Sequence, residues 1–220
     1  KIVGPESIGT GFILGHPKKK DPKLADYILF TAAHVLEGIK GDDAVLVLRV
    51  MDDKGNWKRV EDKLKIRNGG KPLWSKHAAV DAAALKLKDL PVGAFPNLIS
   101  TALLADDKRL KDEEMHPGKD VVCLGYPLGA EANQCGFAIL RSGKIASYPL
   151  LPTKDTKTFL FDFSVFQGNS GGPVYFVEIN PTRGNITTVT TVYGILGLVT
   201  QEVRASQIFQ LPFEVRQVAT

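Results

Sequence analysis

Short runs of β-branched and aromatic residues, separated by turn residues, constrain the fold of this chain more than any other feature. Such runs occur at residues 9–14, 27–31, 44–51 and 172–179, among others, and 21 glycines and 13 prolines supply turn signals along the chain. Apolar runs this short favour many strands over a few long helices. The sequence therefore predicts an all-β protein.

Two groups of predicted strands divide the chain. The first group, whose first two strands are joined by a polar loop at 16–23, comprises residues 9–14, 27–31, 44–51, 64–67 and 82–87. The second group comprises residues 121–124, 136–145, 158–165, 172–179 and 187–199. The charged segment between the groups suits a partly helical surface connection. We predict units at residues 1–105 and 119–220, a connection at 106–118, and a tail at 208–218 that forms a strand or a short helix.

Composition argues against several functions. The formal charge is +4, and the basic run Lys18, Lys19 and Lys20 lies in a proline-bounded loop, so we expect no nucleic-acid partner. No stretch is long enough for a membrane span. Cys123 and Cys135 are either joined by one disulfide bridge or are two small buried apolar residues. Without a nearby histidine they make a poor zinc site. We expect neither a metal nor an organic cofactor.

A serine surrounded by glycines is the strongest chemical signal. Residues 168–173 read GNSGGP, and the glycines leave the backbone around Ser170 free to form a tight turn. Such a turn would aim the amides of Gly168 and Ser170 at one point, where they would stabilise the negative oxygen of a tetrahedral intermediate. The alternative is a glycine-rich loop that only turns a corner. A nucleophilic serine also requires a base and a group that orients the base.

His34 and Asp81 are the candidates for these two roles. His34 follows the predicted strand at 27–31 through two alanines, which let neighbouring backbone pack behind an imidazole, whereas the other histidines lie beside loop-like stretches. Asp81 stands at the entry to an apolar run, where burial against an imidazole is feasible. The alternative for Asp81 is an ordinary turn aspartate, and Asp89 is a weaker rival for the same role.

Chain order separates two classes of serine enzyme. The residues around Ser170 also satisfy GxSxG, the motif of α/β-hydrolases, in which the histidine follows the serine. No histidine occurs after His116, so an esterase or lipase of that class is excluded. The order His34, Asp81, Ser170 is that of chymotrypsin-type enzymes.

Three blocks of sequence resemble the signatures of trypsin-like serine peptidases. They are TAAH at 31–34, DAAALKL at 81–87 and GNSGGP at 168–173. Weaker similarities at 9–14, 125–129, 142–147 and 211–215 resemble the bacterial HtrA-like branch. The resemblance implies two antiparallel six-stranded β-barrels of the chymotrypsin-like type. The catalytic cleft would lie between them, with His34 and Asp81 on the first barrel and Ser170 on the second.

The chain also departs from the digestive trypsins that it resembles. It has Val35 where they carry a cysteine, and Asn169 where they carry the aspartate that pairs with a newly cut terminus. Ile2-Val3-Gly4 looks like such a terminus but has no acidic partner at 169, so we predict activity without zymogen cleavage. No residues remain for the PDZ module usual in HtrA proteins, which implies a stand-alone or trimmed peptidase. Family resemblance predicts a secreted or periplasmic location.

The resemblance places a specificity pocket near Ser164 and residues 197–199. None of Ser164, Gly197, Leu198 and Val199 offers an acid to a basic substrate, and Leu196 offers no histidine to an acidic one. We therefore predict cleavage of proteins or peptides after small or medium apolar residues. The competing hypothesis is a catalytically inactive member of the fold that serves as a binding or scaffold protein, because a collapsed oxyanion loop at 166–169 would be invisible in the sequence.

Overall fold

The computed structural model describes residues 1–88, 90, 99–200, 209–211 and 214–216, and for residues 22–24 and those after 200 it describes the backbone alone. Within this part of the chain, antiparallel strands dominate and helices are short. The predicted all-β fold class is confirmed. No helix among the described residues is long and apolar enough to cross a membrane.

The N-terminal half forms two four-stranded sheets with the orders β2-β1-β5-β6 and β3-β4-β10-β9. Their strands are β1 (Ile2–Gly4), β2 (Ser7–Gly9), β3 (Gly11–Lys18), β4 (Asp21–Thr31), β5 (Asp43–Met51), β6 (Trp57–Lys65), β9 (Ser75–Lys76) and β10 (Ala83–Leu87). A small separate pair consists of β7 (Arg67–Asn68) and β8 (Lys71–Pro72). Helix α1 (Ala33–Glu37) follows β4 directly.

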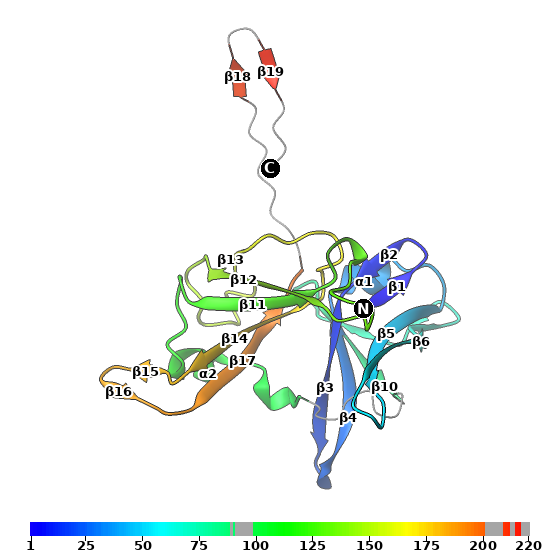
Figure 1. Cartoon of the computed structure of the whole chain (residues 1–220), viewed down its shortest axis with the longest axis horizontal. Coiled ribbons are helices and arrows are strands. Elements are labelled where there is room, and N and C mark those ends of the chain that lie inside the picture. Colours follow the sequence, from blue (N-terminus) through cyan, green and yellow to red (C-terminus); the bar gives the residue numbers. More distant parts are fainter. Residues whose placement is uncertain (89, 91–98, 201–208, 212–213, 217–220) are drawn as a thin grey trace.

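The C-terminal half contains one five-stranded sheet with the order β13-β12-β11-β14-β17 (Figure 1). Its strands are β11 (Asp120–Gly125), β12 (Ile139–Ile145), β13 (Phe161–Asp162), β14 (Pro173–Ile179) and β17 (Thr191–Leu198). Two hairpins consist of β15 (Thr182–Arg183) with β16 (Ile186–Thr187), and of β18 (Phe209–Leu211) with β19 (Glu214–Arg216). The short helices of this half and its approach are η1 (Thr101–Leu103), α2 (Asp107–Asp112) and η2 (Pro127–Gly129).

Each half has its own apolar core, because alternate residues of the strands point inward. In the first core, Leu29, Leu46 and Leu85 from three strands pack with Val35 and Leu36 of α1. The core of the second half is built around Val174 and Phe176 of β14, with strand residues from β11 and β12. The two cores agree with two units, while the predicted boundaries at 105 and 119 stay a prediction.

The connection between the halves contributes apolar residues to the core, although its many charged residues predicted a surface segment. Leu110 of α2 and the following Met115 are both buried in the second core. Asp106 caps α2 by accepting a hydrogen bond from the Arg109 amide at 2.8 Å. The predicted partial helix is therefore present, and it is packed against the C-terminal half.

Several element boundaries differ from those expected. The loop expected at 16–23 is a two-residue turn, because β3 and β4 continue outward as a long hairpin (Figure 1). The strand expected at 158–165 is reduced to β13. Both cysteines are free, so no bridge joins Cys123 to Cys135. Cys123 is buried in the second core, and this burial raises the pKa of its thiol to about 12.

Candidate active site

His34 is held at the surface by a buried helix beneath it. It lies in the first turn of α1, where Ala33, Val35 and Leu36 are buried and the His34 side chain stays 48% exposed. Ala32 and Ala33 are inaccessible to solvent, as their place behind the imidazole requires. The short helix therefore presents the ring outward from a rigid base.

Asp81 forms hydrogen bonds with both the backbone and the ring of His34. Its Oδ1 accepts the His34 amide hydrogen bond at 3.0 Å, and its Oδ2 lies 2.5 Å from His34 Nδ1. Asp81 sits just before β10, whose pairing with β4 brings the two residues together across 47 positions of sequence. With Nδ1 donating to the carboxylate, the neutral ring carries its free lone pair on Nε2.

The surroundings of Asp81 lower the pKa of its carboxyl and so favour the charged form. Partial burial would raise its pKa, but hydrogen bonds from the ring and the amide of His34 outweigh burial and hold the pKa below its ordinary range. An ionised Asp81 only accepts hydrogen bonds, so it holds the His34 ring with Nδ1 as the donor. Asp89, the rival for this role, lies outside the described residues.

The loop carrying Ser170 is packed directly onto the segment that leads to His34. The Ser170 carbonyl accepts a hydrogen bond from the Thr10 amide at 2.8 Å. A Cβ on Gly171 would come within 2.3 Å of Thr31 Oγ1 and 2.9 Å of the Ala32 nitrogen, so only glycine fits there. Among the bonds of the described residues, none joins Ser170 Oγ to His34. Such bonds are often long in substrate-free enzymes.

Gly168 provides a turn that only glycine adopts readily. Its φ is +96°, and the Asn169 amide donates to the Phe166 carbonyl at 3.0 Å across the turn. A positive φ at the third residue is the feature of a type II turn that favours glycine there. A Cβ on Gly168 would also lie 2.2 Å from the Tyr126 carbonyl oxygen. Both the turn and the close packing explain the glycine.

Hydrogen bonds to two carbonyls fix where the amides of this loop point. The Gln167 carbonyl accepts from Leu128 at 2.6 Å, and the Asn169 carbonyl accepts from Gly172 at 2.9 Å. In a trans peptide the N–H points opposite to the C=O. The amides of Gly168 and Ser170 are therefore directed away from these contacts, and neither has an acceptor among the described residues. Two unpaired donors of this kind are the components of an oxyanion hole.

Asn169 is 1% exposed, and neither polar atom of its side-chain amide has a partner among the described residues. The residues Ile2-Val3-Gly4 do not approach it through any described contact, since they form β1, paired with β2 and β5. The trypsin-like terminus suggested by their sequence is therefore an ordinary strand.

The predicted specificity residues are placed unevenly. Ser164 is exposed, and a Cβ on Gly197 would meet no atom within 4 Å, so both border open space. Leu198 instead packs against the first core, and Val199 is buried in the second. The Val199 backbone also bonds to Gly171 and Gly172 of the loop at 166–172, which we call the nucleophile loop after the candidate nucleophile Ser170. Their role in substrate selection stays a prediction.

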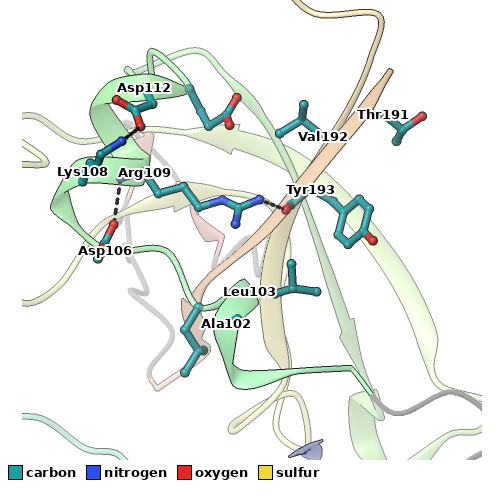
Figure 2. Close-up of a pocket in the computed structure, with 11 residues that line it drawn as sticks. Ala102, Leu103, Asp106, Lys108, Arg109, Asp112, Thr191, Val192 and Tyr193 are labelled. Atoms are coloured by element: carbon teal, nitrogen blue, oxygen red, sulfur yellow. Dashed lines mark hydrogen bonds and ion pairs between the residues drawn. The ribbon is translucent and has the colours of Figure 1, made fainter. Parts of the chain in front are cut away.

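A separate hollow of about 620 Å³ lies between α2 and β17 (Figure 2). Arg109 crosses it and donates to the Tyr193 carbonyl at 2.5 Å, while Lys108 pairs with Asp112. The hollow is lined by neither a serine nor a histidine. Within the described part of the chain, no cluster of three or more metal-ligating side chains is placed to hold an ion.

Comparison with known families agrees with this arrangement. The family model of the trypsin-like peptidase domain matches residues 9–178, more than three-quarters of the chain. The chain belongs to this family. No curated protein gives a significant match. For a trypsin-like peptidase, antiparallel strands in two halves are the architecture of the chymotrypsin-like double β-barrel, and protein or peptide substrates follow from membership.

The matched region of this trypsin-like peptidase includes His34, Asp81 and Ser170. Sequence reasoning missed two residues that shape the same site. Thr10 bonds to the nucleophile loop from the first half, and Leu128 orients the Gln167 carbonyl from the second. Only long-range contacts identify them, because each is an ordinary residue within its local sequence.

Proposed function

We propose that this chain is a serine endopeptidase in which Ser170 is the nucleophile, His34 the general base and Asp81 the residue that orients His34. One observation supports the proposal: the loop that bears a serine and two unpaired amides packs against the segment that leads to a histidine held by a carboxylate. Together they supply the base and the anion site that acyl transfer requires.

The proposed reaction proceeds through an acyl-enzyme. Ser170 Oγ attacks the substrate carbonyl carbon as His34 Nε2 takes the hydroxyl proton, and the amides of Gly168 and Ser170 stabilise the resulting oxyanion. His34 then gives that proton to the leaving amine as the C–N bond breaks. Water repeats the sequence to release the acid and restore Ser170. Throughout, Asp81 fixes the ring orientation and stabilises the imidazolium.

The finer proposals concern substrate and setting. We propose cleavage after small or medium apolar residues, since Ser164, Gly197, Leu198 and Val199 carry no charge. A peptide library should give apolar residues at the cleaved position, and a profile dominated by Arg, Lys or Glu would refute this preference. Asn169 and the weaker sequence similarities support membership of the HtrA-like branch, and with it an extracytosolic location that fractionation of the source cells would test.

The decisive experiment combines labelling and turnover. A fluorophosphonate probe should label the folded wild type and hydrolysis of casein should be measurable, while Ser170→Ala should lose both. Ser142→Ala, which changes an exposed serine of β12, serves as the matched control and should retain both. Absence of labelling and of hydrolysis in folded wild type would favour the scaffold hypothesis.

A further inference from the structure

Thr10 makes four hydrogen bonds that link three parts of the fold. It is 2% exposed and lies between β2 and β3. Its amide donates to the Ser170 carbonyl at 2.8 Å, and its carbonyl accepts from Thr31 Oγ1 at 2.7 Å. Its hydroxyl donates to the Gly168 carbonyl at 2.7 Å and accepts from the Tyr126 amide at 3.1 Å. Every backbone polar group and the hydroxyl of this residue are therefore engaged.

The hydroxyl contact lies at the most adaptable point of the nucleophile loop. Gly168 has no Cβ, so the peptides on both sides of it rotate at little steric cost. The Gln167 carbonyl is fixed by Leu128 before Gly168, and the Gly168 carbonyl is fixed by Thr10 after it. The Gly168 amide belongs to the peptide before Gly168, and the Ser170 amide belongs to the peptide before Ser170. The peptide that joins Gly168 to Asn169 lies between them, so its orientation affects the relative direction of the two amides.

We infer that the Thr10 side chain is a positioning residue for the oxyanion hole. Its hydroxyl locks the peptide that joins Gly168 to Asn169, and thereby keeps the Gly168 and Ser170 amides aimed at one point. The inference rests on the proposed function, and it adds a residue in the first half that controls the anion site in the second. A threonine in the strand-forming segment would otherwise be only a buried β-branched residue.

The expected effect is on the transition state rather than on substrate binding. Without the hydroxyl, the Gly168 carbonyl and the Tyr126 amide lose their partner in a buried site, and the peptide turns toward another donor. Loss of one oxyanion donor reduces kcat by about 100- to 1,000-fold, so partial misplacement should cost roughly 10- to 100-fold. The value of KM should change by less than about twofold, because the amides act on charge that develops later.

The test compares Thr10→Val, which is nearly isosteric, with Thr10→Ala and Thr10→Ser. Valine and alanine should lower kcat per folded molecule as stated, and serine, which keeps the hydroxyl, should restore it to within about threefold of wild type. Thr153→Val is the matched control, since it removes a threonine hydroxyl bonded to Asp107 away from the site. It should reduce stability without changing kcat.

Crystal structures of wild type and Thr10→Val, or Thr10→Ala if valine does not fold, separate this inference from the proposed function. A rotated Gly168 carbonyl in the variant supports the inference even if the wild type proves inactive, in which case the proposed function alone fails. An unchanged loop together with unchanged kcat in an active enzyme overturns the inference and leaves the proposed function intact. An unchanged loop in an inactive wild type overturns both.

Discussion

The side-chain amide of Asn169 lies directly on the Cα of Gly125. A methyl group added to Gly125 would come within 2.3 Å of Asn169 Oδ1 and 3.1 Å of Asn169 Cγ. Gly125 ends β11, so the strand supports the residue before Ser170 without any intervening side chain. The position of Ser170 is therefore coupled to the end of a core strand.

Replacing Gly125 with alanine should displace Asn169 and the adjacent Ser170. We expect a loss of about 1–3 kcal/mol in the free energy of unfolding, typical of an overpacked site. We also expect kcat/KM to fall by roughly 10- to 100-fold, because small misplacements of a nucleophile are costly. Denaturant unfolding and peptide hydrolysis measure the two effects. Gly55→Ala, in open space, is the control and should leave kcat/KM unchanged.

Asn169→Asp should introduce a buried carboxylate that has no partner among the described residues. Such a charge costs about 3–5 kcal/mol, so burial should raise the pKa of the new carboxyl. The penalty should be present at pH 7 and disappear below about pH 4, where the carboxyl is protonated in both folded and unfolded states. Unfolding at pH 7 and pH 3.5 measures it.

A leucine at position 169 provides the comparison for that variant. It has a similar shape and removes amide atoms that make no described bond, so the free energy of unfolding should change by less than about 1 kcal/mol. If Asn169→Asp were as stable as Asn169→Leu at pH 7, a cation or solvent would have to reach the new carboxylate. The burial of the Asn169 side chain argues against such access.

Gly168→Ala should remove the oxyanion hole. The residue has φ +96° and its Cβ would meet the Tyr126 carbonyl oxygen at 2.2 Å, so the turn must change. We expect kcat to fall by about 100- to 1,000-fold, the usual cost of losing one donor. The matched control is Gly184→Ala, which has φ +57° in open space and should cost only backbone strain, roughly 1–2 kcal/mol. Equal kcat values in the two variants would contradict a role for the Gly168 amide.

Asp81→Asn should affect both catalysis and the pH dependence of stability. Because the folded-state pKa of Asp81 is lowered, its carboxylate contributes stability that is fully present above the unfolded pKa of about 3.9 and is lost as pH falls through the folded value. The stability difference between wild type and variant should therefore shrink below about pH 4. At neutral pH, kcat should fall by about 10⁴-fold, because asparagine favours the wrong ring tautomer.

Two measurements decide this prediction. Denaturant titrations of wild type and Asp81→Asn between pH 3 and pH 7 give the stability difference, and single-turnover kinetics give the rate of acylation. A stability difference that stays constant over this range would show that Asp81 is not preferentially ionised in the folded protein. A rate near that of wild type would remove Asp81 from the proposed mechanism.

The sequence was most informative where the chemistry is concentrated in short blocks. The glycines around Ser170 and the alanines before His34 are required by close packing at adjacent positions, so local sequence carries their signal. The contacts of Thr10 and Leu128 are different. Their backbone contacts join residues 160 and 39 positions apart through groups that every residue possesses, and no local pattern marks them.

The hairpin of β3 and β4 shows why a boundary was wrong. Its outer end includes His16 and Lys18, which are exposed, so the alternation of buried and exposed residues that identifies a half-buried strand is lost there. Pairing continues nonetheless, because backbone hydrogen bonds do not require burial. The strand count of six in each predicted barrel also involves residues outside the described ranges and stays a prediction.

The nucleophile loop is tethered from both halves, by Thr10 in one and by Leu128 and Val199 in the other. Neither half by itself contains all of the proposed catalytic groups, so catalytic activity would report on how the two halves pack together. We expect a change at their junction to abolish activity while both cores stay intact. On warming, turnover should then fall before circular dichroism records the loss of strands in either half.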